Sequence, residues 1–361
     1  MGKDLDVSRR EFLGAAAAGS ALIPGSAAFA AMVLGSKVAS ANGAAAPLPL
    51  GASPPAGFVP FNAPGRVVRV KKAGSLQPNQ IYPKPEDAKL MLERVMTELT
   101  GKPTLVDAIK AFVHPQDKVC VKVNGIALSK MATNKELVLP FLEAMIAAGI
   151  PADQITVLEQ YPSFLAGTRI HAGNVPKGVK VAVHNNEDAT MDFRMIPGTG
   201  VQTKFVRVLT ESTALINFSL VKDHSIAGYT GALKNMTHGC TINPHDFHLH
   251  HASPQIALMA AQDVLKSRMR LHIADVFKVT AHGGPLDKMP QYRLPYEAVM
   301  ASTDPVAIDT VGWEIVEQLR ATQHLRTLTA EGRAPAYIEA AGTLGLGVAD
   351  RSRIQLKDVV A

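Results

Sequence analysis

Strand-like and helix-like segments alternate along most of this chain. In residues 119–124, valines point to one side and Cys120, Lys122 and Asn124 to the other, as in a β-strand. In residues 85–100, apolar residues recur at helical spacing and Gly101 ends the pattern. Parallel strands need such helical crossovers. The succession predicts an α/β fold with a mostly parallel or mixed sheet flanked by helices, in one large domain or two interleaved lobes.

The remaining elements are predicted in the same way. Thr133-Asn134-Lys135-Glu136 has the pattern of a capping box and predicts a helix that ends at Gly149. Asp304-Pro305 is typical of a helix start, with Asp304 as the structural cap. Further strands are expected at 67–70, 155–158 and 272–274, a strand-rich stretch at 170–220, and helices at 104–112, 254–265 and 304–319.

Residues 1–41 resemble a twin-arginine (Tat) signal peptide. Ser8-Arg9-Arg10-Glu11-Phe12-Leu13 precedes an uncharged, alanine-rich stretch with small residues at its end. Cleavage after Ala30 or Ala41 fits, and the apolar residues 32–34 favour Ala41. An uncleaved membrane anchor is the alternative, which Pro24 disfavours. We expect export through the Tat translocase to the periplasm or another extracytoplasmic space, with no stable membrane span after cleavage.

The composition indicates where the folded domain begins and which kinds of partner the protein could bind. Residues 42–64 are rich in Pro, Ala and Gly and predict a tether, so residues 65–361 form the α/β domain. The net charge of +6 is scattered and aromatic residues make up 5%, which argues against nucleic-acid binding and favours a small anionic ligand. The two cysteines could pair, or Cys240 could be a ligand or a free thiol. Without a C-x-x-C motif, no iron–sulfur cluster is expected.

A histidine-rich segment at residues 222–251 holds the strongest candidate site. It contains six of the twelve histidines and one of the two cysteines. Imidazole and thiolate bind transition metals, and imidazole also moves protons near neutral pH. The sequence therefore predicts a divalent transition metal, of unknown identity, held by His238, Cys240, His245, His248 and Asp275. Surface histidines, or rings stacked on Phe247, are the alternative.

Polar residues follow several of the predicted strands. In open α/β sheets, ligands bind beyond the carboxyl ends of the strands, so these side chains are expected to share one cleft. Lysine and histidine are suited to anion binding and proton transfer, and asparagine and glycine allow close contact with a ligand. The alternative is that each of these residues is only an ordinary loop residue that follows a strand. The predicted catalytic residues are Lys122, Lys222, His224 and Lys234, and the predicted substrate-binding residues are Asn124, Asn235, Gly283 and Gly284.

The order of these motifs resembles the DUF362 family over residues 65–320. The matching segments are Val121-Lys122-Val123-Asn124, Thr133-Asn134, Val221-Lys222-Asp223-His224, Leu233-Lys234-Asn235, the stretch from Asp275 to Gly283-Gly284-Pro285, and residues 301–309. Many members carry a ferredoxin-like cysteine module that this chain lacks. The resemblance implies an α/β domain and supports Lys122, Asn124, Lys222, His224, Lys234 and Asn235 as site residues. The plan is also similar to that of lactate-racemase-like proteins, which use lysine and histidine around nickel.

Two functions fit these observations. The first is an exported enzyme of unassigned reaction, dependent on a metal or cofactor, that acts on a small anionic metabolite. Its lysines would bind the anion, and a histidine outside the metal site would move a proton. The second is a periplasmic protein that binds a metal or small ligand without catalysis. A closed metal coordination shell would favour the carrier, and an open position the enzyme.

Overall fold

Strands and helices alternate along residues 49–361, the part of the chain that the computed structural model describes. The strands are β1 (Arg66–Lys71), β2 (Val119–Lys122), β3 (Ile155–Glu159), β4 (Lys180–Val183), β5 (Arg194–Ile196), β6 (Val201–Thr203), β7 (Ala214–His224), β8 (Gly228–Thr230), β9 (Met269–Thr280), β10 (Arg293–Ser302) and β11 (Gln355–Val360). The α-helices are α3 (Pro85–Thr100), α4 (Leu105–Ile109), α5 (Lys135–Ala147), α6 (Pro162–Thr168), α7 (Arg207–Thr210), α8 (Ala232–His238), α9 (Gln255–Ala260), α10 (Asp263–Lys266), α11 (Pro305–Thr322) and α12 (Tyr337–Thr343). Short 3₁₀ helices are η2 (Leu128–Lys130), η3 (Ala152–Gln154), η4 (Pro244–Ala252), η5 (Pro290–Tyr292) and η6 (Arg351–Arg353).

Nine of the strands form one mixed sheet. Its main path runs β11, β1, β10, β9, β7, β2, β3, β4, and β8 pairs with β7. The central strand β7 lies parallel to both β2 and β9, whereas β10 is antiparallel to its neighbours β9 and β1. β5 and β6 form a separate antiparallel pair. This topology confirms the predicted α/β fold with a mixed sheet, in one domain.

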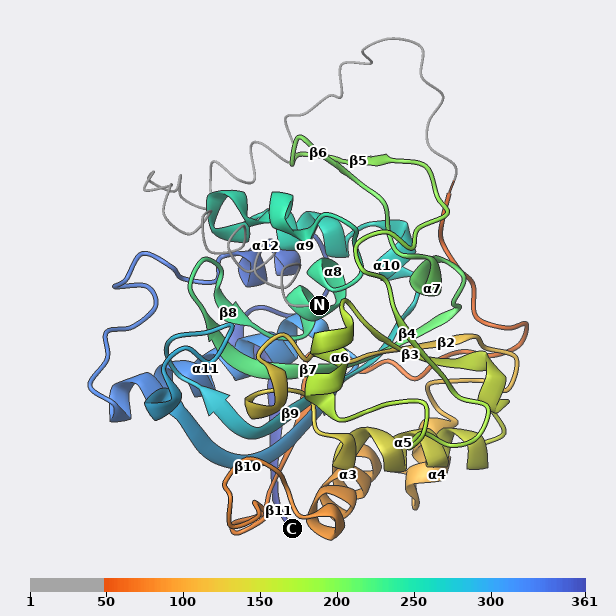
Figure 1. The fold of residues 1–361 in the computed structure, drawn as a ribbon, viewed down its shortest axis with the longest axis horizontal. Helices are drawn as coiled ribbons and strands as arrows, with labels where there is room; N and C mark the ends of the chain where they lie inside the picture. Colours follow the sequence, from red (N-terminus) through yellow and green to blue (C-terminus); the bar gives the residue numbers. More distant parts are fainter. Residues whose placement is uncertain (1–48) are drawn as a thin grey trace, which may run out of the picture.

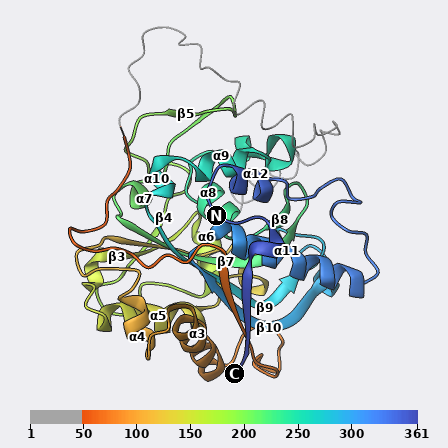
Figure 2. The same ribbon diagram turned by 180° about the vertical axis from the view of Figure 1, so that it is seen from behind.

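Helices cover both faces of the sheet, with α3, α4 and α5 on one side and α8, α9, α10 and α12 on the other (Figure 1). The view from behind gives the same layers (Figure 2). Two apolar cores result: one packs α3–α5 against the sheet, and the other packs α8–α12 against its opposite face. Burial on both faces explains why β7 has no exposed residue along its whole length.

Several element ends follow the sequence signals and others do not. Gly101 ends α3 with a φ of 72°, and the Asp304 side chain caps α11 by accepting from Val306 N and Ala307 N. The capping box predicted at 133–136 is wrong, because Asn134 is the N-cap of α5 and its side chain makes no capping bond. Instead, Asn134 N donates to the Asp275 carboxylate over 2.8 Å.

Two predicted elements have different lengths. The strand expected at 272–274 is the twelve-residue β9, which continues through Asp275 because its inner residues are buried on both faces. The helix expected at 254–265 is interrupted at Ala261–Gln262 and forms α9 and α10. Both differences arise because short apolar runs do not fix where an element ends.

Part of the predicted tether is described, and it lies against the domain. Leu50 N donates to Asp263 Oδ2 over 2.7 Å, and Phe61 N donates to Ala111 O over 2.7 Å. The predicted signal peptide at 1–41 lies outside the described residues. Within residues 49–361, no helix combines the length and apolar character needed to span a membrane.

Candidate functional site

Polar side chains from separate segments meet beyond the carboxyl ends of β2 and β7. Lys222 Nζ donates to Asn124 Oδ1 over 3.0 Å, and Asn124 Nδ2 donates to Asn235 Oδ1 over 2.9 Å. Lys122 forms an ion pair with Glu159 and donates to Val123 O over 2.5 Å. All of these side chains are buried. Because β2 and β7 are parallel neighbours, their lysines reach the same end of the sheet.

Helix α8 brings Lys234, Asn235 and His238 to the same place. Its first turn is held by the Asp309 carboxylate of α11, which accepts from Ala232 N over 2.5 Å and from Leu233 N over 2.9 Å. A negative group at a helix N-terminus is favourable. Burial raises the pKa of Asp309 to about 7, and the two amide donors partly oppose that rise. Asp309 thus fixes the position from which the α8 side chains project.

Three histidine rings lie against one another beside Lys234. The His224 and His248 rings stack with centroids 5.4 Å apart, and the His238 and His248 centroids are 4.6 Å apart. Lys234 Nζ lies 3.1 Å from His248 Nε2. We call the five residues Lys222, Lys234, His224, His238 and His248 the lysine–histidine group.

Hydrogen bonds to Nδ1 assign the proton of His224. This nitrogen accepts from the backbone amides of Ile226 and Ala227, both over 3.1 Å. In the neutral ring the proton must therefore be on Nε2, which is buried and has no partner among the described residues. His224 consequently offers a free donor to a ligand, and in this tautomer its Nε2 cannot bind a metal.

His238 and His248 have the opposite arrangement. His248 Nδ1 lies 3.0 Å from Pro244 O and must carry the proton, so its Nε2 accepts from Lys234. His238 Nδ1 lies 3.2 Å from Thr237 Oγ1, whose own proton is donated to Leu233 O. His238 Nδ1 therefore donates, and its buried Nε2 makes no hydrogen bond of ordinary geometry among residues 49–361, although the Phe247 backbone lies close enough to favour the charged ring.

Burial controls the charge of the group. It lowers the pKa of Lys222 to about 7, although the nearby carboxylate of Glu159 opposes the shift. It also lowers the pKa of Lys234 to about 7, and the positive charge of Lys222 adds to the effect. Burial also lowers the pKa values of the three histidines well below 6.5, so their rings are neutral at pH 7.

The five predicted metal ligands are not brought together. Cys240 is buried in the apolar core, where desolvation raises its pKa to about 12. Asp275 accepts from Asn134 N and Nδ2 at the start of α5, and His245 is exposed with its ring 6.3 Å from that of His248. Residues 49–361 contain no group of three or more His, Cys, Asp or Glu side chains placed to hold a metal ion. Metal binding stays a prediction, and only His238 and His248 of the predicted ligands are adjacent.

The predicted ligand-binding glycines have close backbone neighbours. Gly284 N donates to Asp223 Oδ2 over 3.0 Å, and a side chain at Gly284 would collide with the Asp223 backbone. Gly283 has a φ of 83°, and a Cβ there would lie 2.7 Å from Met289 Cγ. These contacts explain both glycines by packing, and ligand contact at either one stays a prediction.

Residues 119–314 match the family described as "Domain of unknown function (DUF362)", and they make up more than half of the chain. The chain belongs to the DUF362 family. Every residue of the lysine–histidine group lies inside this DUF362 region, as do Asn124 and Asn235. No curated protein matches the chain.

Solved structures similar to this DUF362 protein are distant. A crystal structure of a Thermotoga maritima protein has 10% identity and a TM-score of 0.41, covering 68% of this chain and 60% of that one. The lactate racemase apoprotein from Thermoanaerobacterium thermosaccharolyticum has 11% identity and a TM-score of 0.37, covering 70% and 57%. This chain therefore spans less than two thirds of either protein.

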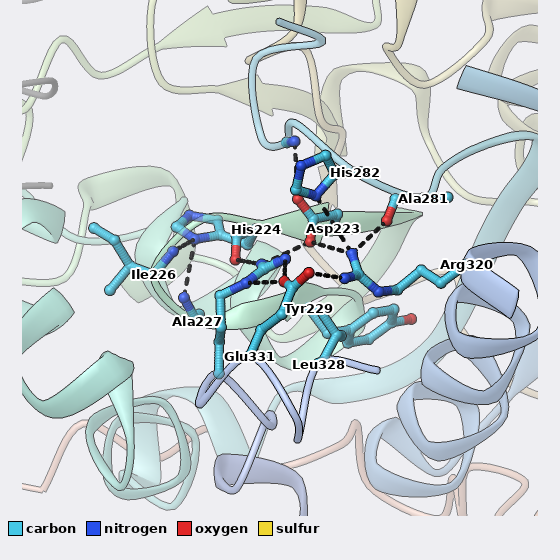
Figure 3. Close-up of polar contacts among 12 residues, drawn as sticks. Asp223, His224, Ile226, Ala227, Tyr229, Ala281, His282, Arg320, Leu328 and Glu331 are labelled. Carbon is cyan, nitrogen blue, oxygen red and sulfur yellow. Dashed lines mark hydrogen bonds and ion pairs between the residues drawn. The ribbon is translucent and has the colours of Figure 1, made fainter. Parts of the chain in front are cut away.

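A charged network outside the predicted set supports His224 from the C-terminal side of the DUF362 region (Figure 3). Arg333 Nη1 donates to Asp223 Oδ1 over 2.7 Å and to His224 O over 2.9 Å. Glu331 pairs with both Arg333 and Arg320, and Arg320 also donates to Ala281 O over 2.9 Å. Because Arg320 and Asp223 are buried, this network fixes the end of β7.

Sequence reasoning also missed Asn217 and His272. Asn235 Nδ2 donates to Asn217 Oδ1 over 2.7 Å, and Asn217 Nδ2 lies 3.2 Å from His272 Nδ1. Asn217 interrupts the apolar run Leu215-Ile216-Asn217-Phe218, and a polar residue inside a buried strand needs a partner. The interruption of an apolar run could therefore have identified Asn217 as a residue with a buried polar partner. Arg320 could have been found in the same way, because it lies four residues after Val316 on the buried side of α11.

Proposed function

We propose that the lysine–histidine group binds a small organic anion and performs an acid–base step on it. The observation that carries this proposal is Lys234. Its Nζ is buried against a neutral acceptor, His248, and it has no carboxylate partner among residues 49–361. Lys222 likewise contacts the neutral amide of Asn124. Buried cations normally have a counter-charge, so a ligand anion is the expected partner.

The roles of the residues follow from their hydrogen-bonding capacity. Lys222 and Lys234 would hold the carboxylate or other oxyanion of the ligand. His224 Nε2–H would donate to a ligand oxygen, and the lone pair on His238 Nε2 would accept a proton from the ligand. The abstracted proton would move to His238, and the electron pair left on the ligand would be stabilised by the lysine cations. No metal is needed for these roles.

Anion binding can be tested by replacing a buried lysine inside the proposed site and, as a control, a buried lysine outside it. Lys234→Met removes the cation of the proposed site, whereas Lys278→Met removes a buried lysine that donates to Lys130 O over 2.7 Å. Titration calorimetry with a panel of small mono- and dicarboxylates should detect binding to the wild type and to Lys278→Met. Lys234→Met should lose at least about 10-fold in affinity. Equal affinity of both variants would contradict the proposed site.

Catalysis requires a separate measurement. Nuclear magnetic resonance in D₂O should show exchange of a C–H proton of a bound anion, and His238→Gln should abolish this exchange while binding persists. If the wild type binds the anion but neither exchanges its proton nor converts it, the protein is a binding protein without catalysis, which is the second function considered above.

We also propose that the mature protein works outside the cytoplasm after Tat export. The support is the Arg9-Arg10 motif and the apolar stretch that follows it. Export of the chain can be followed independently of ligand binding by cell fractionation.

A further inference from the structure

A hollow lies at the opposite end of β7 from the lysine–histidine group. It has a volume of about 320 Å³, and its lining includes Phe61, Lys266, Met269, Arg270, Thr303 and Leu346. Arg270 Nη2 donates to Thr213 O, directly before β7 begins, over 3.2 Å. Since β7 has 11 residues, the two ends of the strand are roughly 33 Å apart. The hollow is therefore separate from the site proposed above.

Two cationic side chains line this hollow without a negative partner. Arg270 is only 6% exposed, and its Nε is buried without a hydrogen-bond partner among the described residues. Lys266 is exposed at the rim. Within residues 49–361, neither side chain forms an ion pair. An unpartnered guanidinium nitrogen in a lined hollow favours an oxyanion, which accepts from such donors in a fixed geometry.

The carboxylates near these cations already accept hydrogen bonds from other groups. Asp117, whose charge favours the charged form of Arg270, accepts from Thr213 Oγ1 over 2.6 Å and from His114 N over 2.8 Å. Asp263 pairs with Arg194 and also accepts from Leu50 N and Val264 N over 2.7 and 2.8 Å. Asp304 accepts from four backbone amides, including Gly65 N over 2.8 Å and Val348 N over 2.9 Å. Each of these carboxylates has its own donors, and within residues 49–361 none of them forms an ion pair with Lys266 or Arg270.

Apart from Asn62 and Thr303, the remaining lining residues are apolar. Phe61 packs edge-on against Phe112 with ring centroids 5.7 Å apart, which holds one wall in place. Met269 and Leu346 add further apolar surface. The volume falls at the lower end of the range of about 300–1,000 Å³ that is typical of small-molecule sites.

We propose that this hollow is a second ligand site, for a small organic anion with a carboxylate or phosphate head and an apolar body. The head would lie between Lys266 and Arg270, and the body against Phe61, Met269 and Leu346. This inference does not depend on the function of the lysine–histidine group.

Phenyl phosphate and benzoate are suitable probes, with inorganic phosphate as the head alone. In titration calorimetry of the full mature chain, Lys266→Gln and Arg270→Gln should each weaken phenyl phosphate or benzoate binding about 10-fold. All variants are made in a Lys234→Met background, so that the lysine–histidine group does not contribute, and Lys177→Gln, which changes another exposed lysine, should leave this affinity unchanged. Inorganic phosphate should bind more weakly than phenyl phosphate, because it cannot use the apolar wall.

A second readout does not depend on the folding of the Arg270 variant. The better-bound probe should slow acetylation of Lys266 several-fold in the wild type, measured by mass spectrometry, and should not protect Lys177. Wild-type affinity in Lys266→Gln together with no protection of Lys266 would overturn the proposal, as would failure of both phenyl phosphate and benzoate to bind at millimolar concentration. If only one of them binds, it identifies the head group.

Discussion

Lys222 Nζ donates to Asn124 Oδ1 over 3.0 Å, and this bond joins the end of β7 to the segment after β2. The acceptor is a neutral amide, so the bond satisfies one proton of Lys222 without neutralising a positive charge. Glu159, the carboxylate that most favours the charged form of Lys222, is itself paired with Lys122. The strand ends are thus held together at a cost in electrostatic energy that a bound anion would offset.

The pH dependence of stability should reveal Lys222. Its pKa is about 7 in the folded protein and 10.5 ordinarily, so between these values the unfolded chain binds the extra proton. The free energy of unfolding should therefore rise with pH above 7, by up to about 1.4 kcal/mol per unit from this lysine. Urea unfolding of the wild type and Lys222→Met at pH 7.5 and 8.5 should show a shallower slope in the variant. Lys234, Lys122, Glu159 and Asp287 surround Lys222 and remain in both proteins, so identical slopes would disprove the lowered pKa.

Two lysine-to-methionine variants should change stability in opposite directions. Lys234→Met removes a buried cation that lacks a carboxylate partner, so it should raise the free energy of unfolding by about 1–3 kcal/mol at pH 7 while anion binding is lost. Lys122→Met leaves Glu159 buried and unpaired, and should lower it by about 3–5 kcal/mol. Denaturant unfolding measures both, and destabilisation by Lys234→Met would contradict the first expectation.

Removing the carboxylate that holds helix α8 should be destabilising. In Asp309→Asn, one of the two acceptors for Ala232 N and Leu233 N becomes an amide donor, at a cost of about 1–2 kcal/mol. Asp350→Asn is a matched control, because Asp350 caps the exposed η6 and its replacement should change stability by less than about 0.5 kcal/mol. Thermal unfolding of both variants gives the comparison.

The charged network at the end of β7 should hold the C-terminal segment in place. Arg333→Gln leaves Asp223 with Arg320 at 3.8 Å as its remaining ion-pair partner, and should lower the free energy of unfolding by about 3 kcal/mol. Hydrogen exchange should accelerate at residues 331–337 and at the amides of Ile226 and Ala227. Arg351→Gln breaks the more exposed pair with Glu314 and should leave these rates unchanged.

The predicted export signal has its own test. Replacing Arg9-Arg10 by Lys-Lys keeps the charge but alters the residues that the Tat receptor reads, so the protein should stay in the cytoplasm. Lys37→Arg, which keeps charge outside the motif, should be exported normally. Cell fractionation decides between these outcomes, and normal export of the Lys-Lys variant would exclude the twin-arginine interpretation.

The sequence predicted those residues of the candidate site that lie at the carboxyl ends of parallel strands. Lys122 and Lys222 end up together because β2 and β7 are parallel neighbours, and a strand-end rule captures that relationship. The rule misplaced Asp275, because β9 continues past it and its carboxylate turns to the start of α5.

Other contacts depend on which segments meet across the chain. Cys240 lies near His238 in sequence, yet it is buried in an apolar core to which many separate segments contribute. Arg333 reaches Asp223 from 110 residues away. Periodicity describes one segment at a time and therefore could not pair these residues.

The burial of both thiols has a practical consequence. Cys120 and Cys240 are the only cysteines in the sequence, both are free and buried, and desolvation raises both of their pKa values. Thiol-directed reagents react with exposed thiolates, so Cys120 and Cys240 should not react with them in the folded protein. A single cysteine introduced on the surface, for example Lys177→Cys, would then take up a fluorophore or spin label at one known position without first removing the natural cysteines.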